Sequence, residues 1–309
     1  MSPAAVISGH VEDYLRLRRA LGFKLEREGQ WLHQFAAYLQ SVGEEKLTSA
    51  AALAWAGQPA PPMSNKPAAR LGVVRRFAIY LHTIDPATQV PPPGVFSYHR
   101  SRPTPYLWSR GEINRLLAGA RAMTNPLRAA THEALFGLLA TTGMRLGEAI
   151  GLARNDVDLH AGVILIRRAK FDRSRLVPVH PTVTAALRRY VADRDRLCLT
   201  PHCEAFFISS TGTALDRSGV ERAFRHITTT SGIRTDTVHP RIHDLRHSLA
   251  VRTMLEWQRT GVSIDQRIGV LSAYLGHVAP ADTYWYLSAS PELMQLAAQR
   301  LDTHLGRKR

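Results

Sequence analysis

The chain has few cysteines and no apolar stretch long enough to cross a membrane. Cys198 and Cys203 are its only cysteines in 309 residues, too few for the disulfide framework of a small secreted domain. No segment reaches the roughly 18 uncharged apolar residues that a membrane span needs. The first residues, MSPAAVISGHVEDYLRLRR, lack the apolar region of a signal peptide. We therefore expect a cytoplasmic protein that does not act in a membrane.

Sequence signals for metal-dependent or nucleotide-dependent chemistry are also missing. There is no G-x-x-x-x-G-K-[ST] loop and no carboxylate cluster for phosphoryl transfer. The segment CLTPHC offers two cysteines and one histidine without a fourth ligand nearby. His243 and His247 have the i, i+4 spacing of a zinc-binding helix, but Arg246 between them would repel a cation. We expect no metal site and no cofactor.

What the chain has in abundance is positive charge. Its formal net charge is +15, its isoelectric point is about 10.5, and arginine dominates the basic residues. So large a one-sided charge is compatible with a compact protein when a polyanion neutralises it. Nucleic acid is the first candidate, and an anionic membrane surface is weakened by the missing apolar segments. A basic scaffold protein without enzymatic activity is the alternative, although such chains are usually short and rich in lysine.

The first part of the chain has the pattern of a small helical unit followed by a linker. Apolar residues recur at helical spacing in residues 10–20, 28–41 and 70–83. The last of these helices carries a predicted basic face, formed by Arg70, Arg75, Arg76 and His82. A proline-rich stretch then interrupts the helical pattern. We expect a helical domain over residues 1–85, a linker over 86–105 and a second domain over 106–309.

The second part has a mixed pattern with more helix than strand. Ser109 and Glu112 have the spacing of a capping box for a helix over 109–121, and Gly143 is placed to end an apolar helix that begins near residue 129. GVILIRR and LVPV indicate a β-hairpin around the turn KFDRSR, and AFFISS indicates a further short strand. Further helices are expected in LGEAIGLA and over 182–197, 217–229, 243–257 and 266–275. The predicted fold is mainly α with a small antiparallel β-sheet.

Several residues of the second part form a chemically coherent set for breaking a phosphodiester bond. In chain order they are Arg145, Lys170, His243, Arg246, His277 and Tyr286. Two guanidinium groups could bind the non-bridging oxygens of the transition state, and a lysine could protonate the leaving 5′ oxygen. A histidine could accept the proton of a tyrosine that forms a covalent intermediate. Taken singly, each of these residues could equally be an ordinary surface or packing residue, and Tyr284 is a second candidate for the nucleophile.

These motifs, in this order, resemble the tyrosine recombinase (phage integrase) family. The likeness is strongest from Thr141 to Ser288, in TTGMRLGEAIGL, KFDRSRLVPV, HDLRHSLA and YLGH. It implies that the catalytic residues are Arg145, Lys170, His243, Arg246, His277 and Tyr286, with Glu148 in support. The family's nucleophile follows the last histidine by nine positions and has a threonine three positions before it. Both features favour Tyr286 over Tyr284.

The resemblance also implies an architecture and a reaction. The expected architecture is a SAM-like, helical core-binding domain followed by a mixed α+β catalytic domain, whose C-terminal helix at 291–305 serves oligomerisation. The expected reaction is site-specific cleavage and rejoining of double-stranded DNA through a 3′-phosphotyrosyl intermediate, in a tetramer and with or without sister recombinases. Integration, excision or transposition of a mobile element would be the context. The alternatives are a type IB topoisomerase-like enzyme and a catalytically silent DNA-binding accessory protein.

Overall fold

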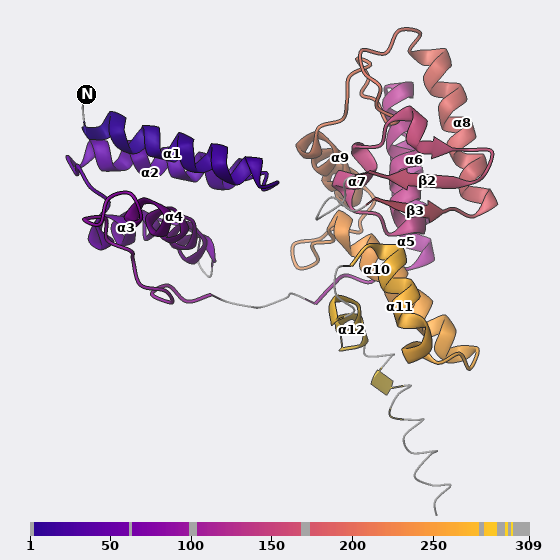
Figure 1. Ribbon diagram of the computed structural model, residues 1–309. Helices are drawn as coiled ribbons and strands as arrows, with labels where there is room; N and C mark the ends of the chain where they lie inside the picture. The colour runs from indigo at the N-terminus through magenta and orange to yellow at the C-terminus, as the bar shows by residue number, and fades with distance from the viewer. Residues whose placement is uncertain are drawn as a thin grey trace, which may run out of the picture. The chain divides into compact units, whose positions relative to one another are not determined.

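The chain forms two compact units, Met1–Arg102 and Pro103–Arg309. The structure is a computed structural model that describes residues 3–61, 64–98, 104–167, 174–277, 281–288, 294–295 and 298. Most of these residues are helical, and a small sheet lies in the second unit (Figure 1). This confirms the predicted fold class. No helix in the described part of the chain is both long and apolar enough to cross a membrane.

The first unit consists of helices packed around one apolar core. They are α1 (Pro3–Ala20), α2 (Glu26–Ser41), α3 (Ser49–Ala56) and α4 (Lys66–His82). The core contains Val11, Leu15, Leu32, Phe35, Leu39, Trp55, Val74 and Phe77. Helix α3 was not predicted, because its sequence SAAALAWA has no polar and apolar alternation to reveal a helical period. Its start is nevertheless defined by Thr48, whose side chain accepts a hydrogen bond from the Ala51 amide at 3.1 Å.

The predicted basic face of α4 is only partly a surface. Arg70 is buried, donates to the Gln58 carbonyl at 3.2 Å, and stacks over the ring of Trp55. Arg75 is half-buried, whereas Arg76 is exposed. Arg70 therefore does not belong to an exposed basic face, because its long side chain turns inward to satisfy a loop carbonyl.

Part of the segment predicted as a linker packs on the first unit. Thr88 is buried and its carbonyl binds His82 Nδ1 at 2.8 Å. Arg75 donates a hydrogen bond to the Pro91 carbonyl, and Phe96 packs on the apolar core. These contacts fix the residues that follow α4 to the unit to which that helix belongs.

The second unit combines helices with an antiparallel three-stranded sheet. The helices are α5 (Arg110–Arg121), α6 (Pro126–Thr142), α7 (Leu146–Ile150), η1 (Arg154–Asp156), α8 (Pro181–Leu197), α9 (Arg217–Thr230), α10 (Ile242–Arg259), α11 (Ile264–Leu275) and α12 (Ala281–Ser288). The strands are β1 (Val157–Asp158), β2 (Val163–Ile166) and β3 (Arg175–Pro178), in the order β1-β2-β3. Buried Ile164 pairs with buried Val177, which joins the sheet to the core around α6.

The structure confirms the predicted cap that begins α5, the glycine that ends α6 and the β-hairpin. Ser109 Oγ accepts from the Glu112 amide at 3.2 Å, and Glu112 accepts from the Ser109 amide at 2.8 Å, which completes the capping box of α5. Gly143 ends α6 with φ of 63°, a left-handed conformation that favours glycine. The predicted hairpin is formed by β2 and β3.

The strand predicted in AFFISS is not formed. Ala205 and Ile208 make only isolated bridges, to Ala153 and Ala214. Phe206 and its neighbour Phe207 are buried instead as aromatic core residues, and the Tyr190 hydroxyl donates to the Phe206 carbonyl at 3.2 Å. The prediction failed because a short apolar run suits a buried loop as well as a strand when side chains satisfy its backbone.

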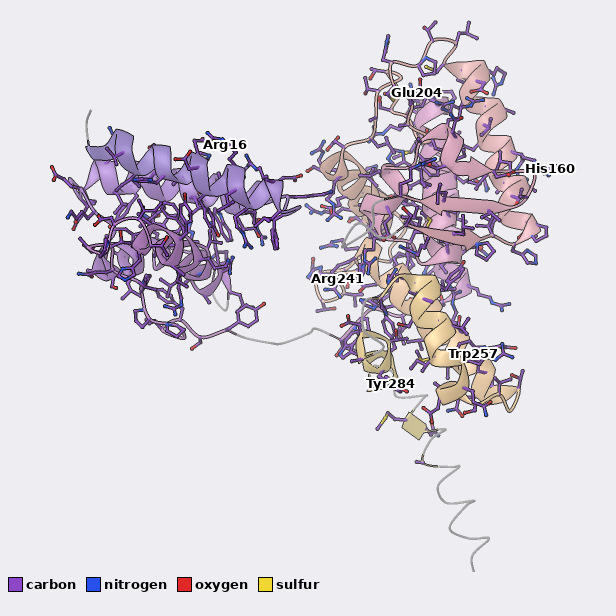
Figure 2. All side chains as sticks on the ribbon, viewed as in Figure 1. Arg16, His160, Glu204, Arg241, Trp257 and Tyr284 are labelled. Carbon is purple, nitrogen blue, oxygen red and sulfur yellow. The ribbon has the colours of Figure 1, made fainter. Side chains whose placement is uncertain are left out.

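A second apolar cluster holds α10, α11 and α12 together. It contains Ala250, Val251, Met254, Leu255, Ile264, Ile268, Leu271, Leu275 and Tyr286. Tyr284, on α12, and Glu204, after α8, lie toward opposite ends of the second unit (Figure 2). The cluster therefore fixes Tyr286 against the helix that begins with the HDLRH segment.

Candidate active site

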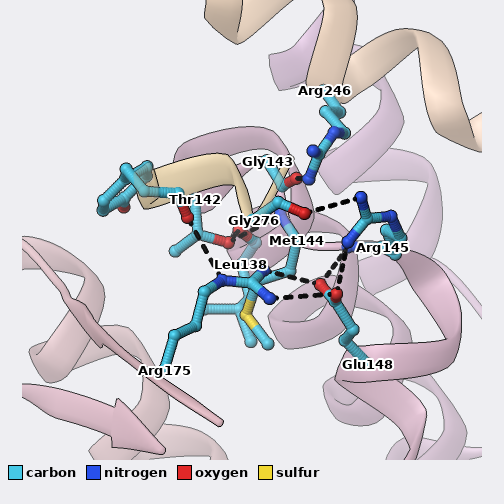
Figure 3. A network of polar contacts seen from close by, with 10 residues as sticks. Leu138, Thr142, Gly143, Met144, Arg145, Glu148, Arg175, Arg246 and Gly276 are labelled. Carbon is cyan, nitrogen blue, oxygen red and sulfur yellow. Dashed lines mark hydrogen bonds and ion pairs between the residues drawn. The ribbon is translucent and has the colours of Figure 1, made fainter. Parts of the chain in front are cut away.

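Arg145 is held at the start of α7 by contacts from two sides. Glu148 accepts from the backbone amide of Arg145 at 2.9 Å and from its Nη1 at 2.7 Å. Nη2 of Arg145 donates to the Gly276 carbonyl at 2.9 Å, which ties α7 to the end of α11 (Figure 3). The guanidinium of Arg145 is thus fixed by a carboxylate and a carbonyl that are 128 residues apart in sequence (276 − 148).

Helix α10 carries Arg246 into the interior of the unit, whereas His243, in its first turn, keeps an exposed surface. Asp244 sets the start of this helix by accepting from the Arg241 amide at 2.7 Å. Arg246 is only 1% exposed, and its Nη1 donates to the Gly143 carbonyl at 2.7 Å. Its Nη2 is buried and has no hydrogen-bond partner among the described residues. A buried guanidinium with a free donor is costly, so it marks a place prepared for an acceptor.

His277 lies directly after the last turn of α11. Gly276 ends that helix with φ of 70°, and the His277 amide donates to the Ser272 carbonyl at 2.9 Å. The His277 ring is oriented by a 2.6 Å hydrogen bond between its Nδ1 and Oγ1 of Thr283. Thr283, three positions before Tyr286, is completely buried. The threonine therefore acts on the histidine ring and fixes how that ring faces Tyr286.

Tyr286 packs among the histidine rings, whereas Tyr284 faces outward. Tyr286 is 2% exposed, and its ring centroid lies 6.0 Å from that of His277 and 5.3 Å from that of His247. Tyr284 is 42% exposed. His243 joins the same group, because its ring centroid lies 4.6 Å from that of His247. The structure thus brings together Arg145, His243, Arg246, His277 and Tyr286.

Burial and positive charge determine the protonation of this site. Burial, and next the charge of Arg246, lower the pKa of His243 and of His277 to about 4. Burial lowers the pKa of Arg246 to about 10, so it remains a cation. Burial raises the pKa of Tyr286, and the nearby Arg246 opposes that rise. At neutral pH the site therefore combines neutral histidines that can accept a proton, fixed cations and a protonated tyrosine.

The unfolding of the second unit should depend on pH because desolvation and the charge of Arg246 keep half-buried His277 and the more exposed His243 neutral in the folded state. Their pKa of about 4 lies below the ordinary value of 6.5, so the unfolded chain binds more protons between these values. We expect the free energy of unfolding to be highest above about pH 6.5 and to fall as the pH drops toward 4. Urea titrations across this range should give a smaller decrease for a His243→Gln, His277→Gln double variant, and equal decreases would contradict the assignment.

Gly143 contributes both to the stability of the second unit and to the geometry of the site. Its left-handed φ of 63° disfavours other residues, and a Cβ there would lie 2.9 Å from Leu275 Cδ2 and 3.0 Å from Leu249 Cδ2. Its carbonyl holds Arg246. We expect Gly143→Ala to cost more than the roughly 1–2 kcal/mol of left-handed strain alone, because the two leucines must also shift, and to lower the melting temperature by several degrees, measured calorimetrically. Gly232→Ala, at φ of 65° with open space around the Cβ, controls for backbone strain alone. An equal loss in both variants would rule out the packing contribution.

In the hairpin between β2 and β3, one predicted site residue is not tested and one residue of the site was missed. Lys170 lies outside the described residues. Arg175, which was not predicted to belong to the site, joins it by donating to both carboxylate oxygens of Glu148, at 3.1 and 2.8 Å. Its position directly before the LVPV strand was the available signal, but only the tertiary fold brings it to Glu148.

A basic pocket adjoins Arg145 and His243. Its volume is about 730 Å³, and its lining includes four further arginines, Arg217, Arg225, Arg234 and Arg241. Such a concentration of guanidinium groups next to the site suits a phosphate backbone. No group of three or more metal-binding side chains occurs within the described residues.

Comparison with known proteins identifies the family. Residues 109–292 match the family model described as the phage integrase family. The chain is 42% identical to the integrase/recombinase y4rB of Sinorhizobium fredii, over 94% of this chain and 96% of that one. It is 28% identical to tyrosine recombinase XerC of Alcanivorax borkumensis, over 60% of this chain and 58% of that one.

Solved structures share the fold at lower sequence identity. A XerH site-specific recombinase, in a post-cleavage complex with its difH substrate, matches with a TM-score of 0.64 and 18% identity, over 87% of this chain and 77% of that chain. A transposon integrase in complex with a circular intermediate DNA also has a TM-score of 0.64, with 14% identity over 97% of this chain and 99% of that chain. The chain therefore belongs to the phage integrase family of tyrosine recombinases.

Proposed function

We propose that this protein is a site-specific tyrosine recombinase that cleaves DNA through Tyr286. The observation that carries the proposal is the buried Arg246, whose Nη2 has no partner among the described residues, beside the equally buried Tyr286. A scissile phosphate between them would supply the missing acceptor. Arg145, His243 and His277 surround the same place, and the proposal assigns each of them a role in one reaction.

The proposed cleavage step balances atoms and charge with groups of the chain itself. Tyr286 Oη attacks the phosphorus, its proton passes to a neutral histidine, and a 3′-phosphotyrosyl bond forms while the bond to the 5′ oxygen breaks. Arg145 and Arg246 stabilise the charge on the non-bridging oxygens. Lys170 protonates the leaving 5′ oxygen. The covalent bond conserves the energy of the phosphodiester, so attack by a 5′ hydroxyl rejoins the strand without ATP or a metal ion.

The proposed partners are double-stranded DNA and further copies of the chain. The net charge of +15 and the arginine-lined pocket support binding to phosphates. The similar lambda integrase, with a TM-score of 0.62 and 13% identity, was solved as a tetramer bound to a Holliday junction. We propose the same kind of assembly here, in the cytoplasm. Residues 1–85 would be a core-binding domain, 86–105 the linker and 106–309 the catalytic domain. The segment 291–305, most of which lies outside the described residues, would serve oligomerisation. Integration, excision or transposition would be the biological context.

Strand exchange between two DNA sites separates this proposal from its alternatives. Duplexes that bind the protein are first selected from a random pool, and pairs of them are then placed on labelled fragments of different length. We expect recombinant fragments in buffer with EDTA and without ATP. The same sites are also placed on a supercoiled plasmid. Relaxation of that plasmid without recombinant fragments would instead indicate topoisomerase-like activity, and binding without any cleavage would indicate an accessory protein.

A further inference from the structure

Arg175 is a half-buried cation that the proposed chemistry does not use. It is the first residue of β3, and its side chain is only 14% exposed. It donates to Glu148 with both terminal nitrogens, at 3.1 and 2.8 Å, in a bidentate arrangement. Its Nε donates to the Tyr274 carbonyl at 3.3 Å. Arg175 therefore connects three separate elements: the hairpin, α7 and the last turn of α11.

The carboxylate of Glu148 is shared between Arg175 and Arg145. Oε1 accepts from both guanidiniums, and Oε2 accepts from Arg175 and from the Arg145 backbone amide (Figure 3). Glu148 is 9% exposed and cannot rely on solvent for hydrogen bonds. The single negative charge of Glu148 is thus shared by the guanidinium groups of Arg145 and Arg175. Without Arg175, Glu148 would pair with Arg145 alone and compete more strongly with an incoming phosphate.

The turn before His277 is held between the same two arginines. Nη2 of Arg145 binds the Gly276 carbonyl at 2.9 Å, and a Cβ on Gly276 would lie 2.5 Å from Nη1 of Arg175. Glycine is thus required both by the left-handed φ of 70° and by the guanidinium packed against it. The position of His277 depends on both arginines through this turn.

We propose that Arg175 is a positioning residue for the cleavage reaction, which aims Arg145 at the scissile phosphate by sharing Glu148 with it. This inference rests on the proposed function. Hydrogen-bond partners that orient metal ligands typically change affinity or activity by about 10- to 100-fold when they are removed, and Arg175 orients a catalytic guanidinium in the same indirect way. We expect an effect of that size on the rate of covalent adduct formation, with DNA affinity changed by less than about threefold.

The first test compares Arg175→Gln and Arg175→Lys with wild type on a nicked suicide substrate at saturating DNA. Arg154→Gln is the matched control, because Arg154 makes an exposed bidentate pair with Asp195 in the same unit. We expect adduct formation to slow by about 10- to 100-fold for Arg175→Gln, by less for Arg175→Lys, and not at all for the control. If Arg175→Gln cleaves as fast as the control while wild type forms adduct, the inference fails and the proposed function stands. If wild type forms no adduct on DNA that it binds, both fail.

A second substrate distinguishes positioning of Arg145 from a loss of folding. Replacing one non-bridging oxygen of the scissile phosphate by methyl removes the negative charge that Arg145 is proposed to stabilise. On the two methylphosphonate isomers, the defect of Arg175→Gln relative to wild type should shrink to less than about threefold for at least one isomer. A defect that stays constant on both isomers would overturn the proposal. So would rescue only by a 5′-thio leaving group, because that result would place the action of Arg175 on Lys170 instead.

Discussion

Tyr286→Phe is expected to abolish the covalent protein–DNA adduct while leaving DNA binding intact. The change removes one hydroxyl from a side chain that is 2% exposed and packed against His247 and His277, so the ring contacts remain. Loss of a nucleophile is among the costliest single changes in an enzyme, and we expect at least about a thousandfold decrease in adduct formation. Gel separation of adduct under denaturing conditions measures it directly.

Tyr284→Phe is the matched control for this prediction. Tyr284 lies on the same helix two residues earlier and is 42% exposed, outside the group of histidine rings. We expect its removal to change adduct formation by less than about threefold, within the range of ordinary surface substitutions. Adduct that survives in Tyr286→Phe and disappears in Tyr284→Phe would move the nucleophile and contradict the geometry described above.

Arg246→Lys is expected to have the second largest effect. The guanidinium of Arg246 binds the Gly143 carbonyl with Nη1 at 2.7 Å and keeps Nη2 for another acceptor. A lysine is a single point charge and cannot satisfy both directions at once. Removing one donor that stabilises a transition-state charge costs on the order of 10²–10³ in rate, and we expect adduct formation to slow by that amount. Saturating DNA separates this rate from binding.

Arg252→Lys is the control for Arg246→Lys, because it also replaces a partly or fully buried arginine on α10. Arg252 is half-buried on the same α10 and donates to the carbonyls of Ser248 and Ala140, at 3.3 and 3.4 Å. Both variants lose backbone hydrogen bonds, but only Arg246 faces Tyr286. A similar slowing in the two variants would mean that the loss at Arg246 reflects folding of α10, and the proposed role in charge stabilisation would be withdrawn.

Much of the second unit could be predicted because its signals are local. The capping box of Ser109 and the glycine at 143 define helix ends within a few residues, and both were confirmed. Motifs that resemble known ones identified Arg145, His243, Arg246, His277 and Tyr286, which the fold then brings together.

What could not be predicted depends on contacts between residues distant in sequence. Arg175 reaches Glu148 across 27 positions, and Arg70 turns inward to a loop carbonyl that no local pattern reveals. Helix α3 lacks a periodic pattern, and AFFISS is apolar enough for a strand but is buried as a loop. Each failure arose where tertiary packing overrode a weak local preference.

The most direct test of the proposed cleavage reaction maps the covalent bond between protein and DNA. Wild-type protein is trapped on a nicked suicide duplex in EDTA without ATP, digested with protease and nuclease, and analysed by mass spectrometry. We predict a nucleotide joined through its 3′ phosphate to the peptide that contains Tyr286, together with a free 5′ hydroxyl on the released strand. A nucleotide on any other residue, or a 5′-phosphate linkage, would contradict the account.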